Sequence, residues 1–309
     1  MRLDRRTPLL ALLLPALIAC PLATVPAATP PAPRALFDNA HGEQSGNADW
    51  VVDDQQPTPR PGQEAIRIST PDTYWLGGIS TWGVELVKRG YRVTTNNLPI
   101  TYGNKRNPLD LSQFDVFVVP EPNRPFSSAE ATAILAFVRG GGGLVAVADH
   151  DRSDRDRDGF DSPRVWNQID PGHLLGVHWG SKGDPNANIT QRSSNIASAR
   201  DAGLLQGAAG TVKALEFHNG TTLTLDTHAN STVRAVVWML GVPRTSPTRV
   251  MAAQASFGTG RVAFIGDSSV IDDGSASPGN TNIFDGWNEA GGSNGILTMN
   301  ATLWVTRRR

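Results

Sequence analysis

Acidic and histidine side chains follow four apolar runs of this sequence, close to the point where each run ends. Asp38, Glu121, Asp149 and Asp267 occupy these positions, and His150 stands beside Asp149. In open α/β sheets, ligands bind in the crevice outside the carboxyl ends of the strands. We therefore expect the five side chains to meet in one crevice, where they could exchange protons with a substrate or hold a divalent metal ion.

A metal ion in this crevice would lower the pKa of a bound water molecule and make it a nucleophile at neutral pH. The predicted metal ligands are Asp38, His41, Asp149, His150 and Asp267. The predicted catalytic residues are Glu121, Asp149 and His150, with Glu121 as the candidate general base. A structural alternative stays open, because an aspartate often accepts backbone N–H bonds in the turn that it begins.

Three further residues are predicted to contact the substrate. Arg152 and Arg155 follow the crevice residues, and a guanidinium suits an anionic substrate group. Ser268 follows Asp267 in the run Gly-Asp-Ser-Ser, which lacks the Gly-x-Ser-x-Gly pattern of a serine nucleophile. Trp50 and Trp287 fall in polar loops, where they belong either to the core or to a rim that stacks on sugars or bases.

An acidic loop follows the Asp149–His150 pair. Asp154, Asp156 and Asp158 alternate with arginines and precede a glycine, as in the first half of a calcium-binding EF-hand loop. The position that would need glutamate is Val165, so the match is partial. Calcium binding, a salt-bridged solvated loop and a substrate-contact loop all remain open.

The elements that must position these residues alternate between strand and helix. The expected strands cover 34–37, 91–95, 116–119, 144–147, 214–217, 222–225, 233–238, 250–257 and 261–265. The expected helices cover 79–89, the stretch from Ser127 to Gly140, 165–175 and a last helix that carries Ile296, Met299 and Leu303. Ser127 and Glu130 form a capping-box pattern. This rhythm predicts an α/β three-layer sandwich with a mainly parallel, doubly wound sheet.

Two stretches carry a family resemblance. GGGGLVAVADH, with the residues from 114 onward that precede it, resembles the strand–elbow region of class I glutamine amidotransferase-like domains. The run that ends in GTGRVAFIGDSS is similar to their uncharacterised gliding-motility and intraflagellar-transport type branch. The resemblance covers residues 34–305 and implies an amidotransferase-like, flavodoxin-like fold.

The elbow departs from the amidotransferase pattern. It reads Ala148-Asp149-His150 where those enzymes place a nucleophilic cysteine, and Cys20 is the only cysteine of the chain. A thiolate nucleophile is therefore excluded, and the chain is not a cysteine glutaminase.

The first 27 residues have the pattern of a secretory signal. Three arginines lie within the first six residues, and an apolar run and small residues follow. Two processing routes stay open: a lipobox ending at Cys20, or cleavage after Ala27. Residues 28–34 are expected to form a linker and 35–309 a single domain. The protein is expected to be periplasmic, an outer-membrane lipoprotein or extracellular, with membrane contact only through a lipid on Cys20.

The composition is that of a soluble globular protein, with 39% hydrophobic and 18% charged residues. The net charge of −1 gives no electrostatic support for nucleic-acid binding. The first functional hypothesis is an exported metal-assisted hydrolase that acts on an extracytoplasmic polymer or phosphoester. The alternatives are a non-catalytic envelope binding or scaffold module that holds a polymer or small ligand, and, with less support, a secreted nuclease.

Overall fold

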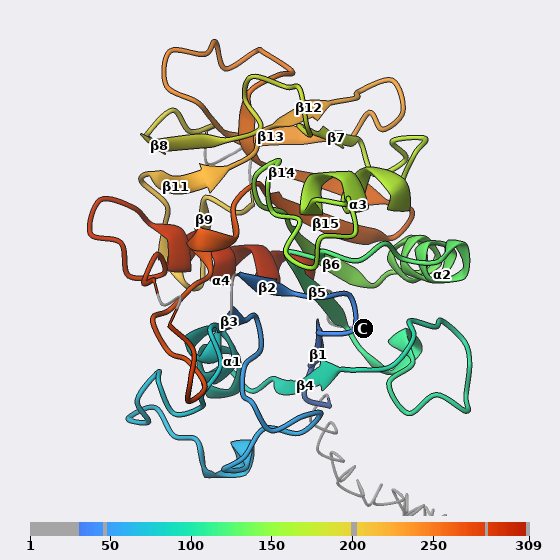
Figure 1. Cartoon of the computed structure of the whole chain (residues 1–309), viewed down its shortest axis with the longest axis vertical. Coiled ribbons are helices and arrows are strands. Elements are labelled where there is room, and N and C mark those ends of the chain that lie inside the picture. Colours follow the sequence, from blue (N-terminus) through green and yellow to red (C-terminus); the bar gives the residue numbers. More distant parts are fainter. Residues whose placement is uncertain (1–30, 46–47, 199–202, 282–283, 307–309) are drawn as a thin grey trace, which may run out of the picture. The chain divides into compact units, whose positions relative to one another are not determined.

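The computed structural model describes residues 31–45, 48–198, 203–281 and 284–306 (Figure 1). The predicted signal segment and Cys20 lie outside the described residues. Among the helices of the described part, none has the length and hydropathy needed to cross a membrane.

The described residues form a central sheet of nine strands in the order β4-β1-β5-β6-β15-β14-β12-β7, with β13 also paired to β14. The five parallel strands are β4 (Arg92–Asn96), β1 (Arg34–Asp38), β5 (Val116–Pro120), β6 (Gly143–Val147) and β15 (Gly260–Ile265). The antiparallel strands are β14 (Val250–Phe257), β12 (Leu223–Leu225), β7 (Val177–Trp179) and β13 (Arg234–Trp238).

The sheet reverses its direction of winding between β1 and β5. From β1 the chain moves outward to β4 and then returns to β5 on the other side of β1. Such a switch point opens a crevice at the carboxyl ends of the two strands. Asp38 ends β1 and Glu121 follows β5, so both predicted site residues flank this position.

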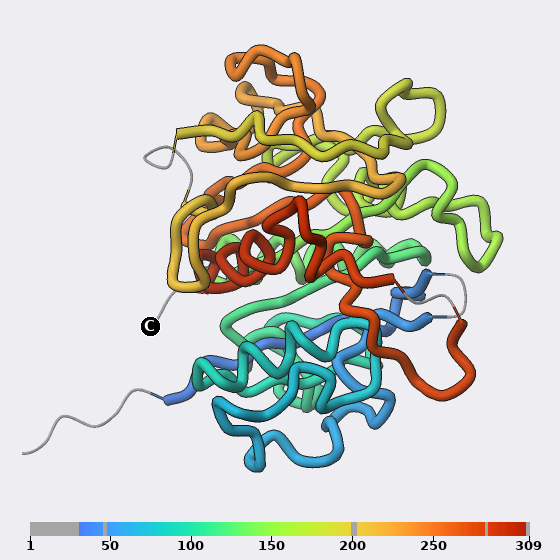
Figure 2. Tube along the Cα trace, turned by 90° about the vertical axis from the view of Figure 1, so that its left-hand side faces the viewer, coloured from blue at the N-terminus to red at the C-terminus, as the bar shows by residue number. Residues whose placement is uncertain are grey.

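Helices cover both faces of the sheet (Figures 1 and 2). The helices α1 (Ser80–Lys88) and α4 (Asn294–Val305) pack into one apolar core, and α2 (Ser128–Arg139) and α3 (Ser162–Ile169) into another. Successive strand residues point to opposite faces, so Phe37 joins the first core and Leu36 the second. The predicted three-layer α/β sandwich with a mainly parallel sheet is confirmed.

Local chemistry explains where the helices begin and end. The predicted capping box of α2 is present: Ser127 accepts from the backbone N–H of Glu130, and Glu130 accepts from that of Ser127. Asp161 caps α3, which ends at Ile169 rather than at 175 as predicted. The reason is Asp170, whose carboxylate accepts the backbone N–H groups of Leu174 and Leu175 and holds that segment as a turn.

Shorter elements decorate the sheet. They are β2 (Gln44–Ser45), β3 (Ala48–Asp49), β8 (Ile189–Ser193), β9 (Gln206–Gly207), β10 (Gly210–Thr211) and β11 (Leu215–Gly220), with the 3-10 turns η1 (Gln63–Ala65), η2 (Leu111–Gln113) and η3 (Ser268–Val270). Predicted strand 214–217 overlaps β11, which pairs with β8 outside the central sheet.

Candidate functional site

Four buried carboxylates stand at the carboxyl ends of four adjacent parallel strands. Asp38, Glu121, Asp149 and Asp267 belong to β1, β5, β6 and β15 or to the residues that follow them, and each is at most 3% exposed. The negative charges of Glu121 and Asp267 both act on Asp149. The strand ends therefore bring at least these three carboxylates into one electrostatic cluster.

Arg155 joins two of them. Its Nε lies 3.1 Å from Oε1 of Glu121, and its Nη2 lies 2.7 Å from Oδ2 of Asp149. Trp50, also buried, donates its indole N–H to the other oxygen of Glu121 at 2.8 Å. One guanidinium thus holds two carboxylates, which we call the Glu121–Asp149 pair.

The backbone of Glu121 is left-handed, with φ of 51°. This conformation is unfavourable for a residue with a long side chain and is concentrated at functional sites. The N–H of Glu121 donates to the carbonyl oxygen of Val147 at 3.1 Å, which ties the turn to the end of β6. The carboxyl groups of Glu121 and Asp149 both contact the guanidinium of Arg155.

Burial gives two of the carboxyl groups an unusual affinity for protons. It raises the pKa of Asp149 well above its ordinary value, with help from the charges of Glu121 and Asp267 and against the charge of Arg155. Burial also raises the pKa of Asp267 to about 7, although two backbone N–H groups favour its ionised form. A carboxyl group that holds a proton near neutral pH can act as a general acid.

His150 is less suited to its predicted roles. Its Nδ1 accepts the backbone N–H of Arg152 at 3.0 Å, and its Nε2 lies 3.5 Å from Oδ2 of Asp149. Burial and the charges of Arg155 and Arg152 lower its pKa to about 4. The ring is therefore neutral at pH 7 and carries its proton on Nε2, so neither nitrogen offers a free lone pair to a metal ion or a substrate proton.

A second cluster surrounds the end of β1. Nδ1 of His41 lies 2.7 Å from Oδ2 of Asp38, and Glu43 accepts the backbone N–H of His41 at 2.8 Å. Oxygen and nitrogen ligand atoms of Asp38, His41 and Glu43 lie within 4.8 Å of one another. Oε1 of Glu43 is fully buried and has no hydrogen-bond partner in the described structure. We call these three residues the Asp38–His41–Glu43 cluster.

Protons are shared unusually within this cluster. Burial raises the pKa of Glu43 well above its ordinary value, and the adjacent Asp38 raises it further. Burial opposes protonation of His41, but Asp38 and Glu130 outweigh it and raise the pKa of the imidazole. Nε2 of His41 lies 3.3 Å from Glu130 at the start of α2. The cluster therefore favours protons on Glu43 and His41.

Asn123 connects the two clusters. Its backbone N–H donates to the carbonyl of His41 at 2.8 Å, and its side-chain amide donates to the carbonyl of Glu121 at 3.0 Å. Its side-chain oxygen accepts the backbone N–H of Arg155 at 3.4 Å. Neither Asn123 nor Trp50 carries a local sequence signal for a contact with a distant strand end, so neither contact was predicted.

The predicted metal ligands therefore fall into separate places. Asp38 and His41 share one cluster with Glu43, whereas Asp149 pairs with Arg155. Both oxygens of Asp267 accept backbone N–H groups, from His218 and from Ser269. This is the structural alternative given above, in which an aspartate accepts backbone N–H bonds in the turn that it begins.

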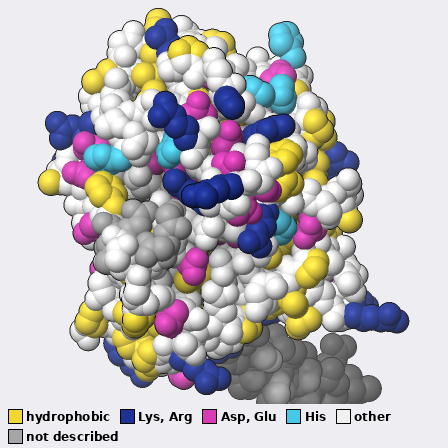
Figure 3. Space-filling model, viewed as in Figure 1, with side chains coloured by type: hydrophobic (Ala, Val, Ile, Leu, Met, Phe, Trp, Pro, Cys, Tyr) yellow, Lys and Arg dark blue, Asp and Glu magenta, His cyan; other side chains and the backbone are white. Residues whose placement is uncertain are grey.

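The predicted substrate contacts differ in their access to solvent. The Arg152 side chain is 78% exposed and only 3.9 Å from Asp151. The guanidinium of Arg155 is engaged by the Glu121–Asp149 pair, and Ser268 is buried at the start of η3. Figure 3 shows acidic, basic and histidine side chains interspersed over the middle of one face of the molecule.

The acidic loop gathers its aspartates. Carboxylate oxygens of Asp154, Asp156 and Asp158 lie within 4.8 Å of one another. One oxygen of Asp154 is shielded from solvent without a hydrogen-bond partner, and Asp156 pairs with Arg124 at 3.0 Å. The interleaved Arg155 pairs outside the loop, with the Glu121–Asp149 pair. A salt-bridged loop therefore does not account for the position of Arg155.

Comparisons with known proteins address the fold. No family model and no curated protein matches the sequence. The mmIFT52 N-terminal domain matches with a TM-score of 0.54 and 13% identity over 88% of this chain and 97% of that one. A protein described as ThuA-like from Bacteroides uniformis matches with a TM-score of 0.45 and 13% identity over 91% of this chain and 94% of that one. Another from Parabacteroides merdae matches with a TM-score of 0.44 and 12% identity over 89% of this chain and 90% of that one.

The chain shares its α/β fold with the mmIFT52 N-terminal domain. The mainly parallel, doubly wound strand order agrees with this likeness. At these identities the likeness extends to the fold alone.

Proposed function

We propose that this chain is an exported, metal-assisted hydrolase of an extracytoplasmic polymer or phosphoester. One observation carries the proposal: the buried Glu121–Asp149 pair stands at the carboxyl edge of the parallel sheet, bridged by Arg155. Two acidic groups buried close together cost the fold free energy, because burial and mutual repulsion both disfavour their charges. Such groups concentrate at active sites. The pair supplies the two proton-transfer groups that hydrolysis needs.

The two carboxyl groups take different roles. Asp149 holds its proton because of burial and neighbouring negative charge, so it is the general acid that protonates the leaving group. Glu121 accepts N–H bonds from Trp50 and Arg155, which fix its carboxylate as the candidate general base. Arg155 positions both groups and stabilises negative charge that develops between them.

A divalent cation fits the Asp38–His41–Glu43 cluster. The cluster offers the carboxylates of Asp38 and Glu43 and, once the proton of His41 is displaced, an imidazole nitrogen. A cation there would displace the protons now favoured on Glu43 and His41. When bound, it would polarise water or a substrate oxygen.

Calcium is proposed as a structural ion of the acidic loop. Asp154, Asp156 and Asp158 would supply its carboxylate ligands. Because Arg155 lies between them in the chain, an ion that orders the loop would also fix the guanidinium over the Glu121–Asp149 pair.

The test measures turnover. The purified mature protein is compared with the Glu121→Gln and Asp149→Asn variants and with Glu64→Gln, an exposed-residue control. Chromogenic phosphoesters and glycosides serve as substrates. We expect turnover in the wild type and the control, and a loss of at least a hundredfold in both site variants. Equal turnover in all four proteins, or none in the wild type, would contradict the proposal.

A second candidate is a non-catalytic envelope binding or scaffold module. The observation that favours it is the closure of the Glu121–Asp149 pair by Arg155, since a fully paired buried network can serve the fold alone. The sequence resemblance to the gliding-motility and intraflagellar-transport type branch agrees with this alternative. A wild type that binds a polymer without cleaving it would support the module.

A further inference from the structure

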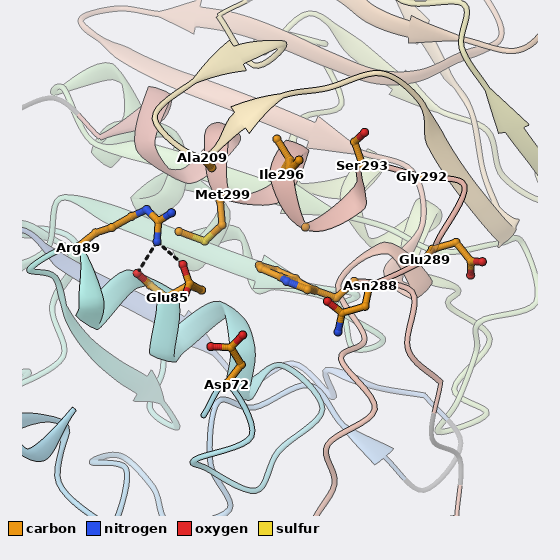
Figure 4. Close-up of a pocket in the computed structure, with 12 residues that line it drawn as sticks. Asp72, Glu85, Arg89, Ala209, Asn288, Glu289, Gly292, Ser293, Ile296 and Met299 are labelled. Carbon is orange, nitrogen blue, oxygen red and sulfur yellow. Dashed lines mark hydrogen bonds and ion pairs between the residues drawn. The ribbon is translucent and has the colours of Figure 1, made fainter. Parts of the chain in front are cut away.

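A separate hollow of about 320 Å³ lies between α1, α4 and the loop that precedes α4 (Figure 4). This volume is within the range of small-molecule sites. Its floor is apolar and is formed by Trp287, Ile296 and Met299. Its walls are polar and are formed by Asp72, Glu85, Arg89, Asn288 and Glu289. In Figure 4 the polar side chains of α1 face Met299 of α4.

The indole of Trp287 is held as a fixed platform. A Cβ atom on Gly295 would stand 2.6 Å from the indole, so the glycine lets the ring lie directly on the first turn of α4. The buried ring of Trp82 backs it, with ring centroids 6.4 Å apart. Trp287 itself is half-buried and lines the hollow. A preformed aromatic surface of this kind binds flat apolar faces at little conformational cost.

The charges of the walls are mostly neutralised. Glu85 pairs with both Arg89 and Lys88, and Lys88 also pairs with Asp72 at 2.6 Å. Glu289 lies 3.4 Å from Nε2 of His218. Three of the four charged wall residues are therefore paired with an opposite charge, and the walls present hydrogen-bond donors and acceptors. This pattern favours a neutral ligand rich in hydroxyl groups over a phosphate or an amine.

We propose that this hollow binds a pyranose ring of a neutral saccharide. The C–H face of the sugar would stack on Trp287, and its hydroxyl groups would bond to Arg89, Asn288 and Glu289. Glu289 of the hollow contacts His218, whose backbone N–H donates to Asp267 at the end of β15. The inference rests on the proposed function and names its substrate class: the extracytoplasmic polymer is a glycan.

The test is calorimetric titration of the full chain with cellotriose, maltotriose and chitotriose as probes. We expect at least one to bind, and we expect Trp287→Ala to weaken binding by about tenfold or more. Trp304→Ala is the matched control, since Trp304 is a half-buried α4 tryptophan that stacks on Arg261 outside the hollow. Asn288→Ala removes an exposed wall side chain without touching the core, and we expect it to weaken binding too.

The outcomes separate this inference from the proposed function. Binding that weakens in Trp287→Ala and Asn288→Ala but not in the control supports the saccharide site, even when no glycoside is cleaved. Failure of all three probes to bind, or binding unchanged in both hollow variants, overturns it. Phosphoester turnover without saccharide binding would leave the hydrolase standing and remove the saccharide site.

Discussion

At the scale of single residues, Arg155 decides the state of the site. It is the cation that faces both Glu121 and Asp149, and its side chain is only 20% exposed. From its position in the sequence, Arg155 was predicted to lie near the crevice and to contact an anionic group of the substrate. Its partners in the structure include a carboxylate 34 residues away, a separation that no local pattern reveals. This pairing fits the positioning role proposed above, and the predicted substrate contact stays a prediction.

Removing this guanidinium leaves the buried carboxylate of Glu121 without its cationic partner. We expect Arg155→Gln to lower the free energy of unfolding by roughly 3 to 5 kcal/mol at pH 7. The loss should shrink at pH 4, because protonation of buried carboxyl groups removes negative charge that no longer has a partner. Urea unfolding at both pH values measures it, and the exposed Arg152→Gln is the control. Equal losses at the two pH values would show that charge is not the cause.

At the scale of elements, the sequence predicts what depends on neighbours in the chain. The spacing of Ser127 and Glu130 predicts the capping box that starts α2, and the structure contains it. The end of α3 was predicted too late, because the carboxylate of Asp170 accepts two N–H groups that a longer helix would use. Glu43 joins the Asp38–His41–Glu43 cluster through the fold of the β1 end, so spacing alone did not place it among the predicted ligands.

The cap itself makes a measurable contribution. We expect Ser127→Ala to reduce the free energy of unfolding by about 1 kcal/mol, since it leaves a backbone N–H of α2 without its acceptor. Ser128→Ala, one residue along, keeps the cap and should change stability much less. Thermal and urea unfolding of the two variants compare them directly. Equal effects would place the Ser127 contribution outside the capping box.

The acidic loop makes the other prediction at this scale. If it binds calcium, saturation at about 100-fold above Kd adds about 2.7 kcal/mol to the free energy of unfolding. We expect chelation to lower the melting temperature of the wild type but not that of Asp156→Asn, in which one carboxylate ligand is lost. The exposed Asp54→Asn serves as the control and should respond like the wild type. A wild-type melting temperature that does not change with calcium would contradict calcium binding by the loop.

At the scale of the whole molecule, the fold gathers negative charge at one edge of the sheet. The fold class follows from the alternation of strand and helix patterns, and these patterns can be read from residues that are neighbours in the chain. Which carboxylates come close depends on strand order and on loops such as 150–161, and these are properties of the assembled sheet. Acidic groups whose pKa is raised by this burial stabilise the fold at low pH and lose that contribution as pH rises. Salt-bridged acids, whose pKa is lowered, show the opposite dependence.

Asp267 shows the sign of this dependence. Its pKa rises from 3.8 to about 7 on folding, so the native state binds more protons than the unfolded state between these values. The free energy of unfolding must then fall as pH rises through this window and level off above it. We expect this term to be on the order of a few kcal/mol, since one pKa unit corresponds to about 1.4 kcal/mol.

The variant Asp267→Ser isolates the contribution, because serine can still accept a turn N–H but does not titrate. Urea unfolding of wild type and variant from pH 4 to pH 8 gives the difference in stability at each pH. That difference should favour the wild type most at pH 4 and decline steadily toward pH 7. A difference that stays constant would mean that Asp267 is ionised throughout, and its carboxylate would then need a bound cation to remain buried in the native protein.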